Sequence, residues 1–319
     1  MILTVTLNAA IDRTVEVPNF RQGRRHRAVE RHTTAGGKGV NVARVLKLLG
    51  KPVIATGFAG GPTGARLLKR LAEESILTDF SRIADESRTN LAVIDPTSGE
   101  QTEVNERGPD VSADEVEAFV QNLLYLAQGA SLCVLAGSIP PGVQPDIYAR
   151  LIAELGRLDV TTLLDAEGEP MRAGLRAGPS VVTPNVSEAE ELVGHEFAEP
   201  EDAVRALRGL AELGAGEAII TRPDGCVARL GPPGEQRVYD ASIEQVDPVA
   251  AVGSGDALLA GYVAGRYDGL SAQECIAYAV ACGAESTQHF GAGKLDPAQI
   301  ERRLASVEIQ EVDARVEVR

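Results

Sequence analysis

The sequence is poor in cysteine, in basic residues and in long apolar runs, and each shortage excludes a class of protein. Its four cysteines, at positions 133, 226, 275 and 282, form neither a metal-ligand spacing nor a disulfide framework, which favours a reducing cytoplasm. The 31 basic residues are outnumbered by 46 acidic ones, and the net charge of −15 argues against nucleic acid as a partner. No apolar stretch reaches the roughly 18 residues of a membrane span, and no signal-peptide pattern opens the chain. We therefore expect a cytoplasmic protein with neither a membrane nor a nucleic-acid partner.

The patterning of the 319 residues predicts an α/β fold. A content of 44% hydrophobic and 24% charged residues is typical of a soluble globular protein. Short apolar runs, such as residues 53–58 and 132–136, alternate with amphipathic helical segments. This alternation predicts a mainly parallel central sheet flanked by helices in three layers, as in Rossmann-type folds. Two strand-rich pieces, about residues 11–35 and 87–108, interrupt the alternation and predict a small added sheet on a single domain spanning residues 1–319.

Polar side chains stand at or just after the ends of several predicted strands. In open α/β sheets, ligands gather at the carboxyl ends of the strands. We therefore expect one shared rim made of Asn8, Ser138, Asp165, Asn185 and Thr221.

Two glycine-rich turns stand before predicted helices and indicate anion binding. Gly253, Ser254 and Gly255 leave the backbone bare where a helix starts, and its unpaired N–H groups and dipole favour phosphate oxygens. Asp256 follows at once, where it could either cap the helix or take a proton from a hydroxyl that attacks the phosphate. The other turn, residues 36–39, carries Lys38 as a mobile cation, although its spacing is not that of the phosphate loop of nucleoside triphosphatases.

Five motifs in a fixed order carry a resemblance to a known family. They are Leu7-Asn8-Ala9-Ala10-Ile11-Asp12, Gly36-Gly37-Lys38-Gly39-Val40-Asn41, Gly137-Ser138-Ile139-Pro140-Pro141-Gly142, Asn185-Val186-Ser187-Glu188 and Gly253-Ser254-Gly255-Asp256. From about residue 1 to about residue 300 the chain resembles the ribokinase-like (PfkB) carbohydrate kinases. Within them it is most similar to the branch of 1-phosphofructokinase and tagatose-6-phosphate kinase.

The resemblance implies a role for each motif residue in an ATP- and Mg²⁺-dependent kinase. Asp256 would be the general base, with the amides of Gly253, Ser254 and Gly255 as the anion hole. Asp12 and Asn41 would hold sugar hydroxyls, and Gly36 and Gly37 would let the backbone come close to the substrate. Asn185 and Glu188 match the magnesium-associated element of the family, acting through water, although a helix cap with a surface acid is the alternative. The nucleotide contacts implied are Asn185, Thr221, Gly225 and Gly283.

Basic residues indicate an acceptor that already carries phosphate. Arg27, Lys38 and Arg88 resemble the positions that grip the sugar phosphate in this branch, and Ser138 would add a hydroxyl contact. For the cluster around Arg27, a solvated face is the plainer interpretation. We expect fructose 1-phosphate as the acceptor and fructose 1,6-bisphosphate as the product, with tagatose 6-phosphate and fructose 6-phosphate as alternatives. A non-catalytic sugar-phosphate sensor is the alternative of another class, and the intact Asp256 with its glycine loop argues against it.

The resemblance also implies that the strand-rich pieces form a lid that closes over the sugar and pairs with its twin in a homodimer. Three departures from the family pattern concern the nucleotide side, where Thr183 replaces a lysine, Pro223 removes a backbone donor and Glu285 replaces an alanine. They leave the nucleotide preference open.

Overall fold

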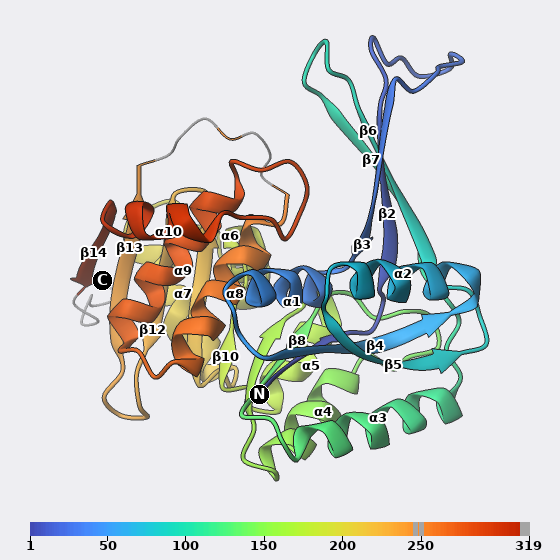
Figure 1. Cartoon of the computed structure of the whole chain (residues 1–319). Helices are drawn as coiled ribbons and strands as arrows, with labels where there is room; N and C mark the ends of the chain where they lie inside the picture. The colour runs from blue at the N-terminus through green and yellow to red at the C-terminus, as the bar shows by residue number, and fades with distance from the viewer. Residues whose placement is uncertain (245–247, 249–251, 313–319) are drawn as a thin grey trace.

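A long sheet forms the middle layer of the computed structural model, which describes residues 1–244, 248 and 252–312 (Figure 1). Within these residues the sheet has ten strands in the order β14-β13-β12-β11-β10-β9-β8-β1-β4-β5. The strands from β11 to β5 run parallel, and β12, β13 and β14 are antiparallel. Their bounds are β1 Ile2–Thr6, β4 Val53–Gly60, β5 Leu77–Ile83, β8 Leu132–Ala136, β9 Thr161–Asp165, β10 Val181–Val182, β11 Glu217–Arg222, β12 Gly225–Leu230, β13 Arg237–Ile243 and β14 Val307–Val312.

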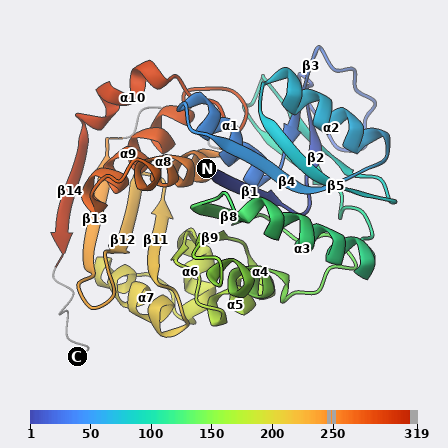
Figure 2. The ribbon, with the colours of Figure 1, turned by 60° about the horizontal axis from the view of Figure 1, so that its bottom comes forward.

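Helices cover both faces of this sheet, as Figure 2 shows. One face carries α1 Lys38–Leu48, α2 Gly61–Glu73, α8 Ser254–Tyr267, α9 Ala272–Ser286 and α10 Pro297–Leu304. The other carries α3 Ala113–Ala127, α4 Ile147–Gly156, α5 Gly168–Arg176, α6 Val186–Val193 and α7 Pro200–Glu212. Two hydrophobic clusters, one on each face, fill the space between the layers. The predicted three-layer α/β fold is confirmed.

Local sequence signals explain where the helices begin. A capping box opens α3 at Ser112, because its side chain accepts from the Glu115 amide while the Glu115 carboxylate accepts from the Ser112 amide. The same reciprocal cap opens α9 at Ser271. The buried strands β1 and β8 read as continuous apolar or β-branched runs because helices cover both of their faces.

The order of the strands reverses at β1, which pairs with β4 on one side and β8 on the other. From β1 the chain builds outward to β4 and β5, and it then returns to build β8 to β11 in the opposite direction. Such a reversal leaves a crevice at the carboxyl ends of the strands, where ligands bind in open α/β sheets. Asn8 follows β1 and Ser138 follows β8, so both lie at this crevice.

A second sheet projects from the body beside this crevice (Figure 1). Its strand order is β3-β2-β6-β7, with β2 Ala10–Glu16, β3 Glu30–Gly36, β6 Arg88–Ile94 and β7 Gln101–Asn105. Apart from Ala10 and Gly36, these strands lie within the two pieces predicted from the sequence, so the small added sheet is confirmed. The register sets Asp12 between Thr34 and Asn90 on one face of it.

Three elements of the structure were not predicted from the sequence. β5 and β14 are the edge strands of the main sheet, and α5 lies where no element was expected. Both edge strands carry charged side chains at exposed positions, which weakens the apolar pattern of a strand and protects a sheet edge from pairing with another chain. Among the described residues, no helix is both long and apolar enough to span a membrane.

Candidate active site

A cleft of about 1510 Å³ lies where the carboxyl ends of the main sheet meet the small sheet. All five residues of the predicted rim line this cleft, as do most of the predicted site residues. The predicted site residues in its wall are Asp12, Gly37, Lys38, Asn41, Arg88, Ser138, Asn185, Glu188, Thr221, Gly225, Gly253, Ser254, Gly255, Asp256 and Gly283. Gly36 and Arg27 do not line it. The fold therefore brings together segments that lie more than 200 residues apart in the chain.

The start of α8 forms the base of the cleft. Gly253 precedes the helix with a φ of 84°, a left-handed conformation that favours glycine. A Cβ at this position would stand 2.6 Å from the Cβ of Ala292, so the turn has no room for a side chain. Because α8 begins at Ser254, the amides of its first turn have no partner within the helix, and residues 253–256 line the cleft, so this helix start is able to bind an anion.

Asp256 is buried at this helix start and has the properties of a general base. Its Oδ2 accepts a hydrogen bond of 2.8 Å from the Nδ2 of Asn41. Burial, and then the negative charge of Asp165, raise the pKa of Asp256 to about 7, against the lowering effects of Asn41, Lys38 and Arg44. A carboxylate with a pKa near neutrality is well matched to accept a proton from an alcohol at physiological pH. The amide NH₂ group of Asn41 is bound to Asp256, a contact that the sequence did not predict.

Lys38 lies among carboxylates. Its Nζ is 2.9 Å from the Oδ1 of Asp165, which ends β9. Burial alone would favour the neutral amine, but Asp165, Glu188 and Asp256 keep the pKa of Lys38 above its usual range. The cation is therefore held near Asp256 and the start of α8.

The small sheet builds one wall of the cleft. Asn90 donates a 2.9 Å hydrogen bond to the Oδ1 of Asp12, and burial raises the pKa of this carboxyl group. A Cβ on Gly36 would stand 1.8 Å from the Oδ2 of Asp12. Gly36 thus makes room for Asp12 rather than lining the cleft itself. Thr34, opposite Asp12 in the register, is part of the same wall.

Arg88 and Ser138 lie together at the crevice. The Nε of Arg88 donates to the carbonyl oxygen of Asn8 over 3.0 Å, and its Nη1 donates to the carbonyl of Glu106 over 3.1 Å. The Nδ2 of Asn8 donates to the Ser138 hydroxyl over 3.2 Å. Both hydrogen bonds of Arg88 go to backbone carbonyls, and the carboxylates of Asp12 and Glu106 act on its charge from nearby.

Arg27 lies elsewhere. It is exposed in the connection between β2 and β3, beyond the Glu16–Glu30 pair at the far end of these strands from Asp12. The predicted group of three phosphate-binding cations therefore does not assemble within one chain. The physical reason is the length of the small sheet, which carries its distal turn away from the cleft (Figure 1).

The predicted magnesium element forms a helix cap. The Asn185 Oδ1 accepts from the Glu188 amide over 3.0 Å, and the Glu188 carboxylate accepts from the Asn185 amide over 2.9 Å. Burial raises the pKa of Glu188, and the negative charge of Asp165 raises it further, whereas the positive charge of Lys38 lowers it. The alternative interpretation, a helix cap, is present, and Glu188 also lines the same cleft as Asp165. The magnesium role stays a prediction.

The residues predicted to contact a nucleotide also line the cleft. Thr221 and Asn185 form a bridge between neighbouring chain segments, and Gly225 has a φ of 149° with no room for a Cβ against Ala241. Gly283 packs closely against Leu258 of α8. Of the departures noted in the sequence, Thr183 is buried and its hydroxyl has no partner. Glu285 is buried beneath the wall and held by His289 and Arg303.

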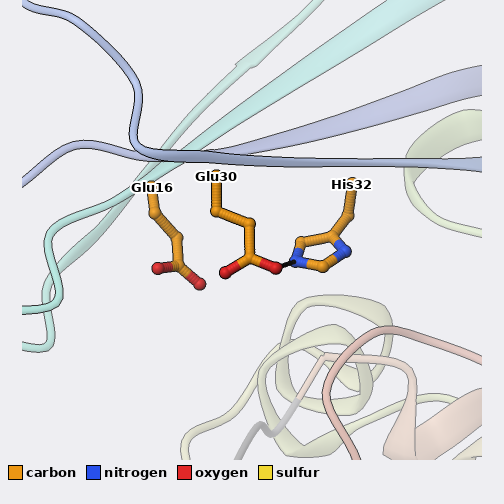
Figure 3. A group of neighbouring side chains, drawn as sticks. All are labelled: Glu16, Glu30 and His32. Atoms are coloured by element: carbon orange, nitrogen blue, oxygen red, sulfur yellow. Dashed lines mark ion pairs between the residues drawn. The ribbon is translucent and has the colours of Figure 1, made fainter.

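A further group of potential metal ligands, Glu16, Glu30 and His32, lies on the small sheet, and in Figure 3 the three side chains point to the same side of it. Glu30 and His32 are exposed, and the 3.2 Å between their Oε1 and Nε2 atoms is that of an ordinary surface ion pair. The ring of His32 also packs against Phe290 at a centroid distance of 5.6 Å, which links the small sheet to the body.

Sequence reasoning assigned no role to Asn90, Arg44 or Asp165, apart from placing Asp165 on the rim. Asn90 could have been found from its spacing to Arg88, because alternate residues of a strand share a face. Arg44 stands three residues after Asn41, on the same side of a helix. The pairing of Asp165 with Lys38, 127 residues away, left no signal in the sequence.

Comparison with known proteins agrees with this geometry. The family model for pfkB family carbohydrate kinases matches residues 3–299, so the chain belongs to this family and is a phosphotransferase that acts on an alcohol group. It is 32% identical to the 1-phosphofructokinase of Borreliella burgdorferi over 283 residues, which are 89% of this chain and 90% of the relative. A structure from Thermotoga maritima, described as a possible 1-phosphofructokinase, has a TM-score of 0.88 at 27% identity and covers 98% of this chain and 100% of its own.

Two structures of phosphofructokinase-2 from Escherichia coli are similar as well. One is a tetrameric inhibited form and the other is a complex with fructose-6-phosphate. Their TM-scores are 0.87 and 0.85, both at 26% identity, and each covers 95% of this chain and 98% of its own. The chain is thus a sugar kinase of the phosphofructokinase type.

Proposed function

We propose that this protein transfers the γ-phosphoryl group of ATP to fructose 1-phosphate and forms fructose 1,6-bisphosphate. The observation that carries the proposal is Asp256, a buried carboxylate at the bare start of α8, in a cleft that also exposes the cation of Arg88. In the reaction a bond forms between the acceptor hydroxyl oxygen and the γ-phosphorus. The bond from that phosphorus to the bridging oxygen of ADP breaks, and the hydroxyl proton passes to Asp256.

The residues around Asp256 fit the electrostatics of this step. Phosphoryl transfer depends mainly on positioning and on stabilising charge that spreads over the transferred oxygens. The amides at the start of α8 and the ammonium of Lys38 supply positive charge on the two sides of that group. Asp12, oriented by Asn90, holds a sugar hydroxyl by a directional hydrogen bond.

ATP and Mg²⁺ fit the remaining part of the cleft. A typical small-molecule site measures about 300–1,000 Å³, so 1510 Å³ accommodates a nucleotide together with a sugar phosphate. Glu188 and Asn185 would hold Mg²⁺ through water, since this ion keeps much of its hydration shell. When bound, the ion neutralises phosphate oxygens. Asp165 and Glu188 give this wall more negative charge than Lys38 balances, which suits a cation.

The choice of acceptor is tested by a coupled assay of ADP release with fructose 1-phosphate, tagatose 6-phosphate and fructose 6-phosphate. The Borreliella relative is named for the first of these activities, and the E. coli relative was solved with the third sugar. We expect the highest kcat/KM with fructose 1-phosphate. Turnover of an unphosphorylated sugar together with inactivity on all three phosphates would contradict the proposal, and binding without any turnover would indicate a sensor.

Replacing Arg88 with methionine is expected to raise the KM for the sugar phosphate by about 10–100-fold, because a charge-assisted contact contributes about 1.5–3 kcal/mol. The KM for ATP should stay within about twofold, since Arg88 lies on the sugar side. Steady-state kinetics with each substrate varied in turn measures both constants. An equal rise in the two KM values would place Arg88 outside the phosphate site.

We further propose that the small sheet is the lid of a single-domain cytoplasmic kinase and that two lids pair in a homodimer. Leu91 and Val104 pair across β6 and β7 and are exposed on the face away from Asp12, which leaves apolar surface for a partner. The four cysteines are free and buried, in keeping with a reducing compartment. Analytical ultracentrifugation of the Leu91→Glu variant, expected to be monomeric, tests the dimer. An unchanged sedimentation coefficient would contradict it.

A further inference from the structure

Arg44 is a fully hydrogen-bonded cation near the cleft. It lies in α1 and is buried, and its five N–H groups match five contacts with the rest of the protein. Its Nε and Nη2 pair with the two carboxylate oxygens of Glu74, which follows α2. The Nη2 also donates to the Ala35 carbonyl at the base of the small sheet over 2.8 Å. The Nη1 donates to the Oδ1 of Asn41 over 3.0 Å and to the Ala292 carbonyl over 3.5 Å.

These contacts decide which end of the Asn41 side chain faces Asp256. The guanidinium can only donate, so it can pair only with the carboxamide oxygen of Asn41. The NH₂ group of Asn41 is therefore the end that points at Asp256, 2.8 Å from its Oδ2. An NH₂ group can only donate as well, and it stabilises the carboxylate of Asp256 rather than the carboxylic acid. A chain of contacts thus runs from Glu74 through Arg44 and Asn41 to Asp256.

We propose that Arg44 is a positioning residue for proton transfer, which fixes the orientation of the Asn41 carboxamide and thereby keeps Asp256 in the form that accepts a proton. This inference rests on the proposed role of Asp256 as the general base. Without Arg44 the carboxamide can turn over, because the terminal torsion of asparagine is broad and its two ends are similar in shape. The oxygen would then face Asp256 and accept a hydrogen bond from the protonated acid.

The direction in which the pKa of Asp256 changes when Arg44 is removed follows from the groups that act on this carboxyl group. Burial and Asp165 raise the pKa of Asp256, whereas the contact from Asn41 and the charges of Lys38 and Arg44 lower it. Loss of Arg44 removes one lowering charge and reverses the effect of Asn41, while Asp165 and Lys38 remain. The pKa of Asp256 therefore rises, and activity at neutral pH falls because less of the base is ionised.

The test is the pH dependence of kcat/KM in the Arg44→Met variant, measured between pH 5.5 and 9. We expect the acidic limb of the profile to move upward by about one pH unit, which corresponds to a tenfold loss of kcat/KM at the low-pH end. Above the shifted limb, most of the activity should be recovered. Arg44→Lys keeps the charge but cannot reproduce the five contacts, so its limb should move by a smaller amount. A uniform loss at every pH, with the limb in place, would reduce Arg44 to a structural residue and overturn the proposal.

Two controls separate positioning from folding. Arg266 is also partly buried and paired, with Glu217 at the far end of α8, so Arg266→Met should lower the melting temperature without moving the limb. In an Asn41→Ala background, the Arg44→Met substitution should move the limb much less than it does in the parent enzyme, because Arg44 acts through Asn41. An equally large shift in that background would contradict the proposed route.

A measurement without turnover distinguishes failure of this inference from failure of the proposed function. The ¹³C carboxyl resonance of Asp256, assigned by comparison with Asp256→Asn, reports its protonation in the free protein. We expect its titration midpoint to be higher in Arg44→Met than in the parent. If the parent phosphorylates none of the sugar phosphates, the proposed function fails while this titration still decides the role of Arg44. An unchanged midpoint in an active enzyme would contradict the inference alone.

Discussion

Replacing Asp256 with asparagine is expected to lower kcat by about three orders of magnitude, within the range of about 10²–10⁴ that general base catalysis contributes. The amide keeps the shape of the side chain and can present its oxygen to the NH₂ of Asn41, so the geometry at the start of α8 should persist. The affinity for the sugar phosphate should therefore change by less than about threefold, since Arg88 and Asp12 are untouched. Rapid-quench kinetics for turnover and calorimetry for binding measure the two effects. Retention of a tenth of the parent activity would mean that another group takes the proton.

The same substitution should stabilise the protein above neutral pH. A carboxyl group whose pKa rises on folding binds its proton more tightly in the folded state than in the unfolded one. Its ionisation therefore costs no stability below the unfolded pKa near 3.8, and the cost grows until the pH passes the folded value of about 7. A shift of about three units corresponds to about 4 kcal/mol, of which we expect on the order of 2–4 to appear.

Denaturant unfolding of the parent and the Asp256→Asn variant at pH 5 and pH 8 measures this gain. The difference in unfolding free energy at pH 5 should be about 40% of its value at pH 8, because pH 5 lies about 1.2 units above the unfolded pKa in a shift of about three units. At catalytic sites a buried charge commonly lowers the stability of the folded protein while it is required for activity. Equal stability of the two proteins at pH 8 would show that Asp256 is not held in an unfavourable environment.

Replacing Lys38 with methionine has the second largest expected effect, a loss of about 10²–10³ in kcat, because it removes positive charge beside the transferred phosphoryl group. Stability should fall too, since the nearly buried Asp165 loses its ion-pair partner. Breaking a buried pair costs about 3–5 kcal/mol, and we expect about 2–3 because 37% of the Lys38 side chain is exposed. Loss of this cation also raises the pKa of Asp256, so the acidic limb of the pH profile should move upward.

The double variant Lys38→Met with Asp165→Asn separates the two consequences. Neutralising Asp165 removes the unpaired charge, so most of the lost stability should return. Turnover should stay low, because the cation that faces the transferred group is still missing. Recovery of turnover together with stability would assign Lys38 a structural role only.

Elements that depend on interactions within a few residues of the chain could be predicted from short-range sequence patterns. The glycines before α1 and α8 and the apolar run of β8 each depend on interactions within a few residues, and the structure has them as expected. The edge strands β5 and β14 could not be predicted from such patterns, because one side of each strand is open and charged residues are tolerated there.

By itself, the sequence determined the class of fold and most of the residues that line the cleft, because glycines, helix starts and strand ends impose their geometry locally. Only the tertiary structure decided how the polar groups pair. It turned Asn41 toward Asp256, set Lys38 against Asp165, gave Gly36 the task of making room for Asp12 and left Arg27 outside the cleft. These outcomes depend on how α1, α8 and the small sheet pack together. Side chains far apart in the chain compete for the same few partners, and only their distances in space decide which of them pair.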